Sequence, residues 1–163
     1  MDDTGAVLAF WILTVMTLGA ALMVVIARNL LHAVLSLILS FIGVAGLYIT
    51  LSADFVAVTQ VLIYAGAISV LILFAMMLTP RAARDNSETF LQGPALVLAG
   101  LMAATIAGVA AATDWSEASR GPFTETAQAI GEALLNTYVL PFEIASVLLL
   151  AAMVGAIVLV RED

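Results

Sequence analysis

Residues 53–81 read ADFVAVTQVLIYAGAISVLILFAMMLTPR, and no charged side chain stands between Asp54 and Arg81. A helix needs about 20 residues to cross the hydrocarbon layer of a bilayer, so this run is long enough to span it. Each backbone N–H and C=O in hydrocarbon needs a partner within the protein, which favours a helix over an open strand. Pro80 ends the run because proline cannot continue helical hydrogen bonds, and Arg81 suits the membrane interface. The stretch predicts a transmembrane helix over residues 55–78.

Four other apolar runs have the same character. The predicted spans are residues 6–27, 31–51, 55–78, 94–112 and 140–160. The first two are joined by so short a connection that they must form an antiparallel hairpin, and Pro94 suits the first turn of its helix. All five runs are about twice the length of a membrane β-strand. The predicted fold class is an all-α membrane protein, a five-transmembrane-helix bundle that forms a single membrane domain over residues 1–163.

The composition excludes several classes of function. The chain is 64% hydrophobic and only 10% charged, whereas soluble domains are near half apolar and a quarter charged. It has no Cys, which excludes disulfides and thiolate-bound zinc or iron-sulfur clusters, and its single His offers little to a metal. The net charge of −7 argues against nucleic-acid binding. We therefore expect no catalytic residue, no metal and no bound cofactor in this chain.

The long connection before the last span contains a helical pattern. Within TETAQAIGEALLNTY, residues 124–138, Ala127, Ile130, Leu134 and Tyr138 recur at helical spacing, with polar residues on the other faces. The pattern predicts a short amphipathic helix on the membrane surface or on a partner protein. The alternative is a loosely ordered loop.

The positive charges predict an orientation. Alternating crossings place four Arg on one side of the membrane and one on the other, and the positive-inside rule then puts the N-terminus outside and the C-terminus in the cytoplasm. Eight carboxylates and one Arg on the outer side sum to −7, while the inner side sums to zero. The inner set is Arg28, Arg81, Arg84 and Arg161, and the outer Arg is Arg120.

Two carboxylates are candidates for proton transfer. Glu143 lies about one turn into the last predicted span, where a charged carboxylate is costly unless it faces protein or water or stays protonated. It is either part of a proton relay or an interfacial acid that the helix dipole favours. Asp54 precedes the third span, and the favoured interpretation is a helix N-cap, with a transport role as the alternative.

Small residues indicate close helix packing at two places. Ser36, Ser40, Gly43 and Gly46 form a groove along one face of the second span, where another backbone can approach. In the third span, Tyr64-Ala65-Gly66-Ala67 contains a Gly that weakens an α-helix by about 1 kcal/mol relative to Ala. This segment is either a π-bulge, which often marks a functional site, or a site of close packing.

Three stretches together resemble a known family. They are RNLLHAVLSLIL (Arg28 to Leu39), ADFVAVTQVLIYAGAISVLILFAMML (Ala53 to Leu78) and LPFEIASVLLLAAMVGAIVLV (Leu140 to Val160), with QVLIYAGA as the most specific part. The chain resembles subunit J, the chain 6 family, of the bacterial proton-pumping NADH-quinone oxidoreductase, respiratory complex I. The fourth span and the loop after it match only in length and character.

The resemblance implies a non-catalytic membrane-arm subunit that couples quinone reduction to proton translocation through a switchable third helix. A π-bulge there would involve Tyr64, Ala65 and Gly66, with Val70 one turn on, and its conversion to α-helix would open or close a water path. No acid lies between Phe55 and Leu78, so a carboxylate in the proton path must be Glu143 or Asp54.

The resemblance also implies partners and a location. The partners are a small three-helix subunit, a subunit with buried carboxylates, the quinone-arm subunit and the lipid bilayer, in the inner (plasma) membrane of a bacterial cell. NADH, FMN, iron-sulfur clusters and quinone would belong to the complex and not to this chain. The alternatives are a cation/proton antiporter subunit, a ferredoxin- or F420-linked relative of complex I, and a purely structural helix bundle.

Overall fold

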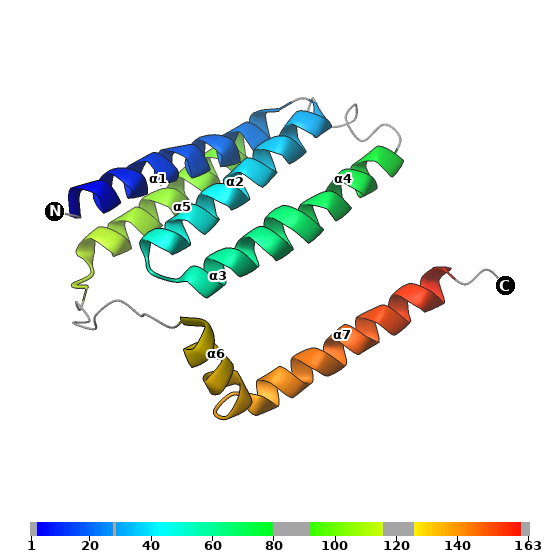
Figure 1. The fold of residues 1–163 in the computed structure, drawn as a ribbon. Coiled ribbons are helices and arrows are strands. Elements are labelled where there is room, and N and C mark those ends of the chain that lie inside the picture. The colour runs from blue at the N-terminus through cyan, green and yellow to red at the C-terminus, as the bar shows by residue number, and fades with distance from the viewer. Residues whose placement is uncertain (1–2, 28, 80–91, 116–125, 161–163) are drawn as a thin grey trace.

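The computed structural model describes residues 3–27, 29–79, 92–115 and 126–160, and within them it is helical with short connections (Figure 1). Five of its helical stretches are long and apolar enough to cross a membrane. The prediction of an all-α membrane protein with five such helices is confirmed. The elements in chain order are α1 (Asp3–Ile26), α2 (Leu30–Thr50), α3 (Asp54–Thr59), η1 (Gln60–Ile68), α4 (Ser69–Leu78), α5 (Gln92–Ala112), α6 (Thr126–Leu135) and α7 (Val139–Val160).

The helix α2 is the centre of the packed part of the molecule. It lies against α1 on one side and against the continuous rod of α3, η1 and α4 on the other (Figure 1). Of the described side chains, those that are buried come mainly from α2 and from the faces turned towards it. These three layers of helix position the third span.

Small residues bring α1 and α2 together. A Cβ atom added to Gly43 would overlap the Thr17 hydroxyl, and one added to Gly46 would lie 2.6 Å from Leu13 Cδ2. The Ser40 hydroxyl donates a long hydrogen bond, 3.5 Å, to the carbonyl oxygen of Thr17. The groove predicted along the second span is therefore a contact face, and α1 fills it.

The turn from α2 into α3 corrects one prediction. Ser52 has a left-handed φ of 56°, and the Ala53 amide donates back to the Tyr48 carbonyl at 2.9 Å, which closes the end of α2 in the manner of a Schellman motif. The chain thus enters α3 at once, with Ala53 as the N-cap and Asp54 as the first helical residue, and no side chain caps this helix. The prediction that Asp54 is the N-cap was wrong, because the turn completes one residue earlier.

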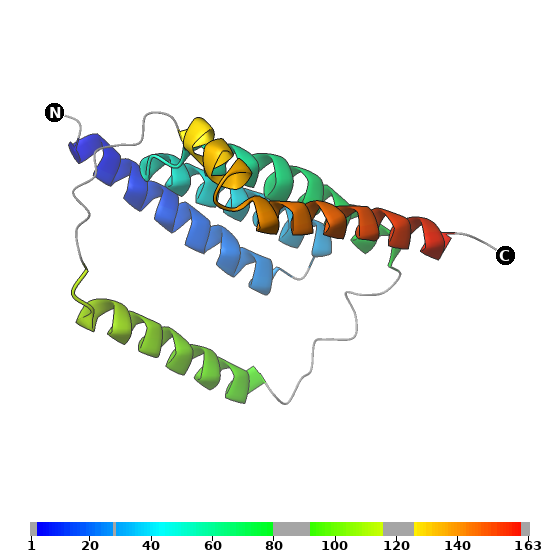
Figure 2. The same cartoon turned by 90° about the horizontal axis from the view of Figure 1, so that it is seen from below.

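The helices α5 and α7 stand apart from this packed unit. Within the described residues α5 contacts no other helix, and Figure 2 shows it well separated from α1 and α2. The helix α7 contacts only α6, which in turn touches α3 and lies inside the range predicted for an amphipathic helix. Every described side chain of α5 and α7 is exposed, so both helices offer largely apolar surfaces to lipid or to other proteins.

The start of α1 and the end of α7 lie at opposite ends of the molecule, as an odd number of antiparallel spans requires (Figure 1). All five Arg of the chain, as well as Pro80, lie outside the described residues. The orientation with the N-terminus outside and the C-terminus in the cytoplasm stays a prediction.

Candidate functional site in the third span

The third span is one unbroken rod whose middle is not an α-helix. Residues Gln60–Ile68 form a π-helix, nine residues long, between α3 and α4. Tyr64, Ala65 and Gly66 lie inside this segment, and Val70 is the second residue of α4, just beyond it. A π-helix is rare and frequently occurs at functional sites, so this segment is the candidate site.

The π-helical segment ends at a serine that bonds back across five residues. The Ser69 amide is shared between the carbonyl oxygens of Gly66 and Tyr64, and the Ser69 hydroxyl donates to the same Tyr64 oxygen at 2.7 Å. Ser69 is 0% exposed. The amide and the hydroxyl of the buried Ser69 therefore both donate to the Tyr64 carbonyl oxygen, which the wider π-helix brings within hydrogen-bond distance.

The wider helix also decides which polar side chains share a face. Gln60 and Ser69 are nine residues apart, which in an α-helix at about 100° per residue leaves them roughly half a turn apart, on opposite faces. Here both are buried, at 8% and 0% exposed, on a rod that packs against α2. The π-helical segment therefore turns both polar side chains towards α2.

An aromatic contact joins the segment to α2. The rings of Tyr64 and Phe41 meet edge to face, with centroids 5.7 Å apart and an interplanar angle of 70°. Tyr64 is 45% exposed, so the other side of its ring faces away from the bundle. A Cβ atom added to Gly66 would lie 3.3 Å from the Val61 carbonyl oxygen, which the π geometry brings close. Gly66 is therefore the residue that leaves room for that carbonyl.

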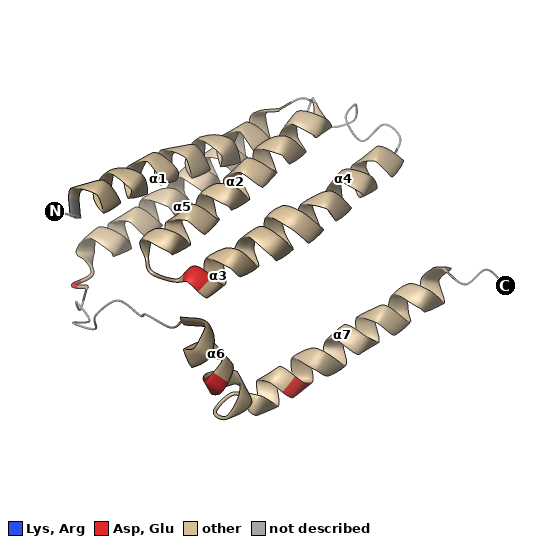
Figure 3. Ribbon diagram, in the orientation of Figure 1, with Lys and Arg blue, Asp and Glu red and all other residues tan. Residues whose placement is uncertain are grey.

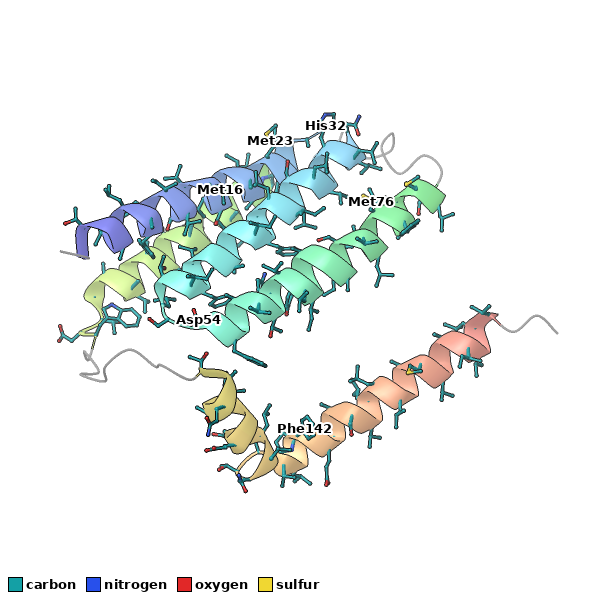
Figure 4. All side chains as sticks on the ribbon, in the orientation of Figure 1. Met16, Met23, His32, Asp54, Met76 and Phe142 are labelled. Carbon is teal, nitrogen blue, oxygen red and sulfur yellow. The ribbon has the colours of Figure 1, made fainter. Side chains whose placement is uncertain are left out.

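Asp54 borders a hollow beside the start of the π-helical segment. The hollow has a volume of about 370 Å³ and lies between Ala45 and Ile49 of α2 and Ala57 and Val61 of the third span. Its walls are almost wholly apolar, and the Asp54 side chain at its end is exposed (Figure 4). In the first turn of α3 the carboxylate is favoured by the positive end of the helix dipole.

Glu143 lies on a different part of the molecule. It is an exposed residue of α7, and the hydroxyl of Ser146 donates to its backbone carbonyl at 2.7 Å. Within the described residues α7 makes no contact with α3, so the structure does not bring Glu143 and Asp54 together. Figure 3 shows the acidic positions of α3, α6 and α7 at the same end of the molecule.

Metal ligands are not gathered at any described position: the described residues hold no cluster of three or more His, Asp or Glu side chains. Sequence reasoning missed Gln60 and Ser69, the two buried polar residues of the third span. Both residues could be noticed in the sequence, because they are polar residues in a span without charge. Their nine-residue spacing, however, places them on opposite faces of an α-helix, so the sequence does not indicate that they share a face.

The comparisons with known proteins agree with one another. Residues 20–159 match the family described as NADH-ubiquinone/plastoquinone oxidoreductase chain 6, and this range contains the whole third span. The chain is 44% identical to NAD(P)H-quinone oxidoreductase chain 6 of Synechocystis sp., over 96% of this chain and 81% of that protein. It is 39% identical to F(420)H(2) dehydrogenase subunit J of Methanosarcina mazei, over 94% and 90% of the two chains. It is 38% identical to NADH-quinone oxidoreductase subunit J of Rhodobacter capsulatus, over 94% and 80%.

Proposed function

Because the chain belongs to the NADH-ubiquinone/plastoquinone oxidoreductase chain 6 family, we propose that it couples quinone reduction to proton translocation through its third span. The chain is a subunit of a complex I-type quinone oxidoreductase and a multi-pass protein of the inner membrane. Its own contribution is conformational and not catalytic. The observation that carries the proposal is the π-helical segment Gln60–Ile68 in the middle of a membrane-spanning rod.

The proposed mechanism is a change between π-helix and α-helix. Conversion of Gln60–Ile68 to a regular α-helix would rotate Ser69 by roughly half a turn relative to Gln60. The Ser69 hydroxyl, which now faces α2, would leave that face, while Gln60 would stay on it. A chain of water molecules along the α2 side of the rod would lose one of the two polar groups that hydrogen-bond it, so the two helix forms would conduct protons differently.

Replacing Gly66 by Leu tests the proposal. A side chain at this position presses on the Val61 carbonyl oxygen in the π form. It therefore favours the α form and should lower the proton yield per electron in membrane vesicles that oxidise NADH. A matched variant is Ala67→Leu, at an exposed neighbouring position. Unchanged turnover and unchanged proton yield in the Gly66 variant would favour a purely structural helix bundle.

Glu143 and Asp54 are the carboxylates we propose for the proton path. Each is a titratable group in or at the end of a membrane-length helix, where a side chain that gains and loses a proton is rare outside functional sites. Because α7 makes no contact with α3 within the described residues, we propose that Asp54 and Glu143 act at two separate places on the proton path and not as a hydrogen-bonded pair. Asp54 stands beside the apolar hollow at the start of the third span, and Glu143 stands on a helix that other subunits would cover.

Other subunits of the complex are the proposed partners of the exposed helices. The faces of α5 and α7 would pack against the three-helix subunit, the subunit with buried carboxylates and the quinone-arm subunit. The complex would use NADH, FMN, iron-sulfur clusters and quinone, all outside this chain.

The electron donor has a second candidate, because one relative is named as a subunit of an F(420)H(2) dehydrogenase. Membranes from a deletion strain, assayed with NADH and with reduced F420, separate the two donors. Full quinone reduction with both donors after deletion would favour a subunit of a cation/proton antiporter.

A further inference from the structure

We propose that the Ser69 hydroxyl is a positioning group that stabilises the π form of the third span, so that its removal shifts the segment towards α-helix. Ser69 acts through the backbone and touches no substrate. The inference rests on the proposed function only in its consequence for pumping, because the hydrogen bond itself is a feature of the helix. Its evidence is the direction and length of one hydrogen bond in a fully buried place.

The bond differs from the other hydroxyl bonds of the described helices. Serine and threonine hydroxyls in helices normally bond to the carbonyl three or four residues back. In this chain the hydroxyls of Thr14, Thr17, Thr50, Thr59, Thr79, Thr105, Thr113 and Ser146 all do so. The Ser69 hydroxyl alone among them reaches back five residues, to Tyr64.

The Tyr64 carbonyl oxygen, which accepts this hydrogen bond, is stabilised by the second donor. The backbone donor that the structure shows for the Tyr64 oxygen is the Ser69 amide, and this amide is divided between the carbonyl oxygens of Gly66 and Tyr64. The site is closed to solvent, and a buried carbonyl without a full partner is costly. In a regular α-helix the Tyr64 carbonyl would receive the undivided amide of Ile68, and the hydroxyl would add little. The hydroxyl therefore stabilises the π form more than the α form.

The experiment uses the whole purified complex, imaged by electron cryo-microscopy with and without quinone and NADH, and sorts particles by the form of the third span. Ser69→Ala should raise the ratio of α to π particles by roughly two- to thirteenfold, the range expected for one net hydrogen bond. Ser69→Cys, whose thiol is a weak donor, should lie between Ala and the natural Ser. The matched control is Thr59→Val, which removes an ordinary hydroxyl bond, 2.9 Å to Phe55, in the same span. It should leave the ratio unchanged.

Two outcomes overturn the inference. The first is a Ser69→Ala complex whose α to π ratio equals that of the natural complex, and the second is an equal shift in the Thr59→Val control. Failure of the proposed function has a different signature: the natural complex keeps the π form in every state. In that case the inference stands if α particles appear in Ser69→Ala, and it falls if none appear.

Discussion

Deleting Ala65 and Gly66 together should convert the third span to a regular α-helix without turning its two ends relative to each other. Gln60 and Ser69 are nine residues apart, and seven after the deletion. At about 100° per residue, seven residues bring the two positions within roughly 20° of whole turns, whereas nine leave them half a turn apart. The shortened rod can therefore bury both polar side chains against α2 as a regular α-helix.

The expected result is an assembled complex that no longer changes the form of its third span. Because both ends of the rod keep their faces towards α2, we expect the subunit to be retained in amounts close to those of the natural protein. The proton yield per electron should fall by most of its value. The assay is quinone reduction by NADH in sealed membrane vesicles, measured alongside proton uptake with a pH-sensitive dye.

A matched deletion separates rotation from shortening. Removal of Ile72 and Leu73 shortens the rod equally but turns the residues that follow by about 200° relative to α2. That variant should lose the subunit from the complex, because apolar contacts of α4 with α2 are misplaced. Our reasoning is refuted if the Ala65 and Gly66 deletion carries a regular α-helix and still pumps with the natural proton yield.

Three further predictions concern other parts of the chain. Gly43→Ala should destabilise the pairing of α1 and α2 by about 1–3 kcal/mol, because the added Cβ atom would overlap Thr17. The control Gly19→Ala should not destabilise it, because a Cβ atom there has no neighbour within 4 Å. Thermal melting of the purified complex measures both variants. Ser52→Gly should raise the melting temperature through a gain of about 1 kcal/mol, because Gly adopts a left-handed φ without penalty. Glu143→Gln should lower the proton yield while the complex stays assembled, and an unchanged yield would identify Glu143 as an interfacial acid.

The sequence predicted the spans because bilayer thickness sets their length, whatever the contacts between them. It also predicted the contact face of α2, since Gly43 and Gly46 leave room for a neighbouring helix. It could not assign positions to α5 and α7, because apolar side chains cover nearly the whole of both helices and no continuous polar face orients them. The start of α3 was misjudged for a local reason: Ser52 adopts a left-handed conformation that is uncommon for serine.

The candidate site was predicted in part. The Gly in the Tyr64-Ala65-Gly66 stretch drew attention to a segment that has π-helical geometry in the structure, while the functional role of that segment stays a prediction. The role of Ser69 was not predictable from its surroundings, because a serine within a helix normally bonds three or four residues back and looks unremarkable in the sequence. Its importance depends on the helix type, which local residue patterns do not specify.

The pair Gln60 and Ser69 nevertheless carries a constraint that follows from their spacing and from the contact of the third span with α2. If the third span were a regular α-helix, one of the two would face away from any single neighbouring helix, and an amide or hydroxyl exposed to hydrocarbon costs several kcal/mol unless it is hydrogen-bonded. A serine can satisfy itself on its own helix, but a glutamine amide needs partners that its own backbone supplies poorly. Burial of Gln60 towards α2 is therefore the stronger requirement of the two. With Gln60 facing α2, Ser69 faces away from α2 in an α-helix and towards α2 in a π-helix. The helix form thus decides whether the face against α2 holds one polar group or two. A water path along that face would therefore have a different number of protein groups to hydrogen-bond with in the two forms.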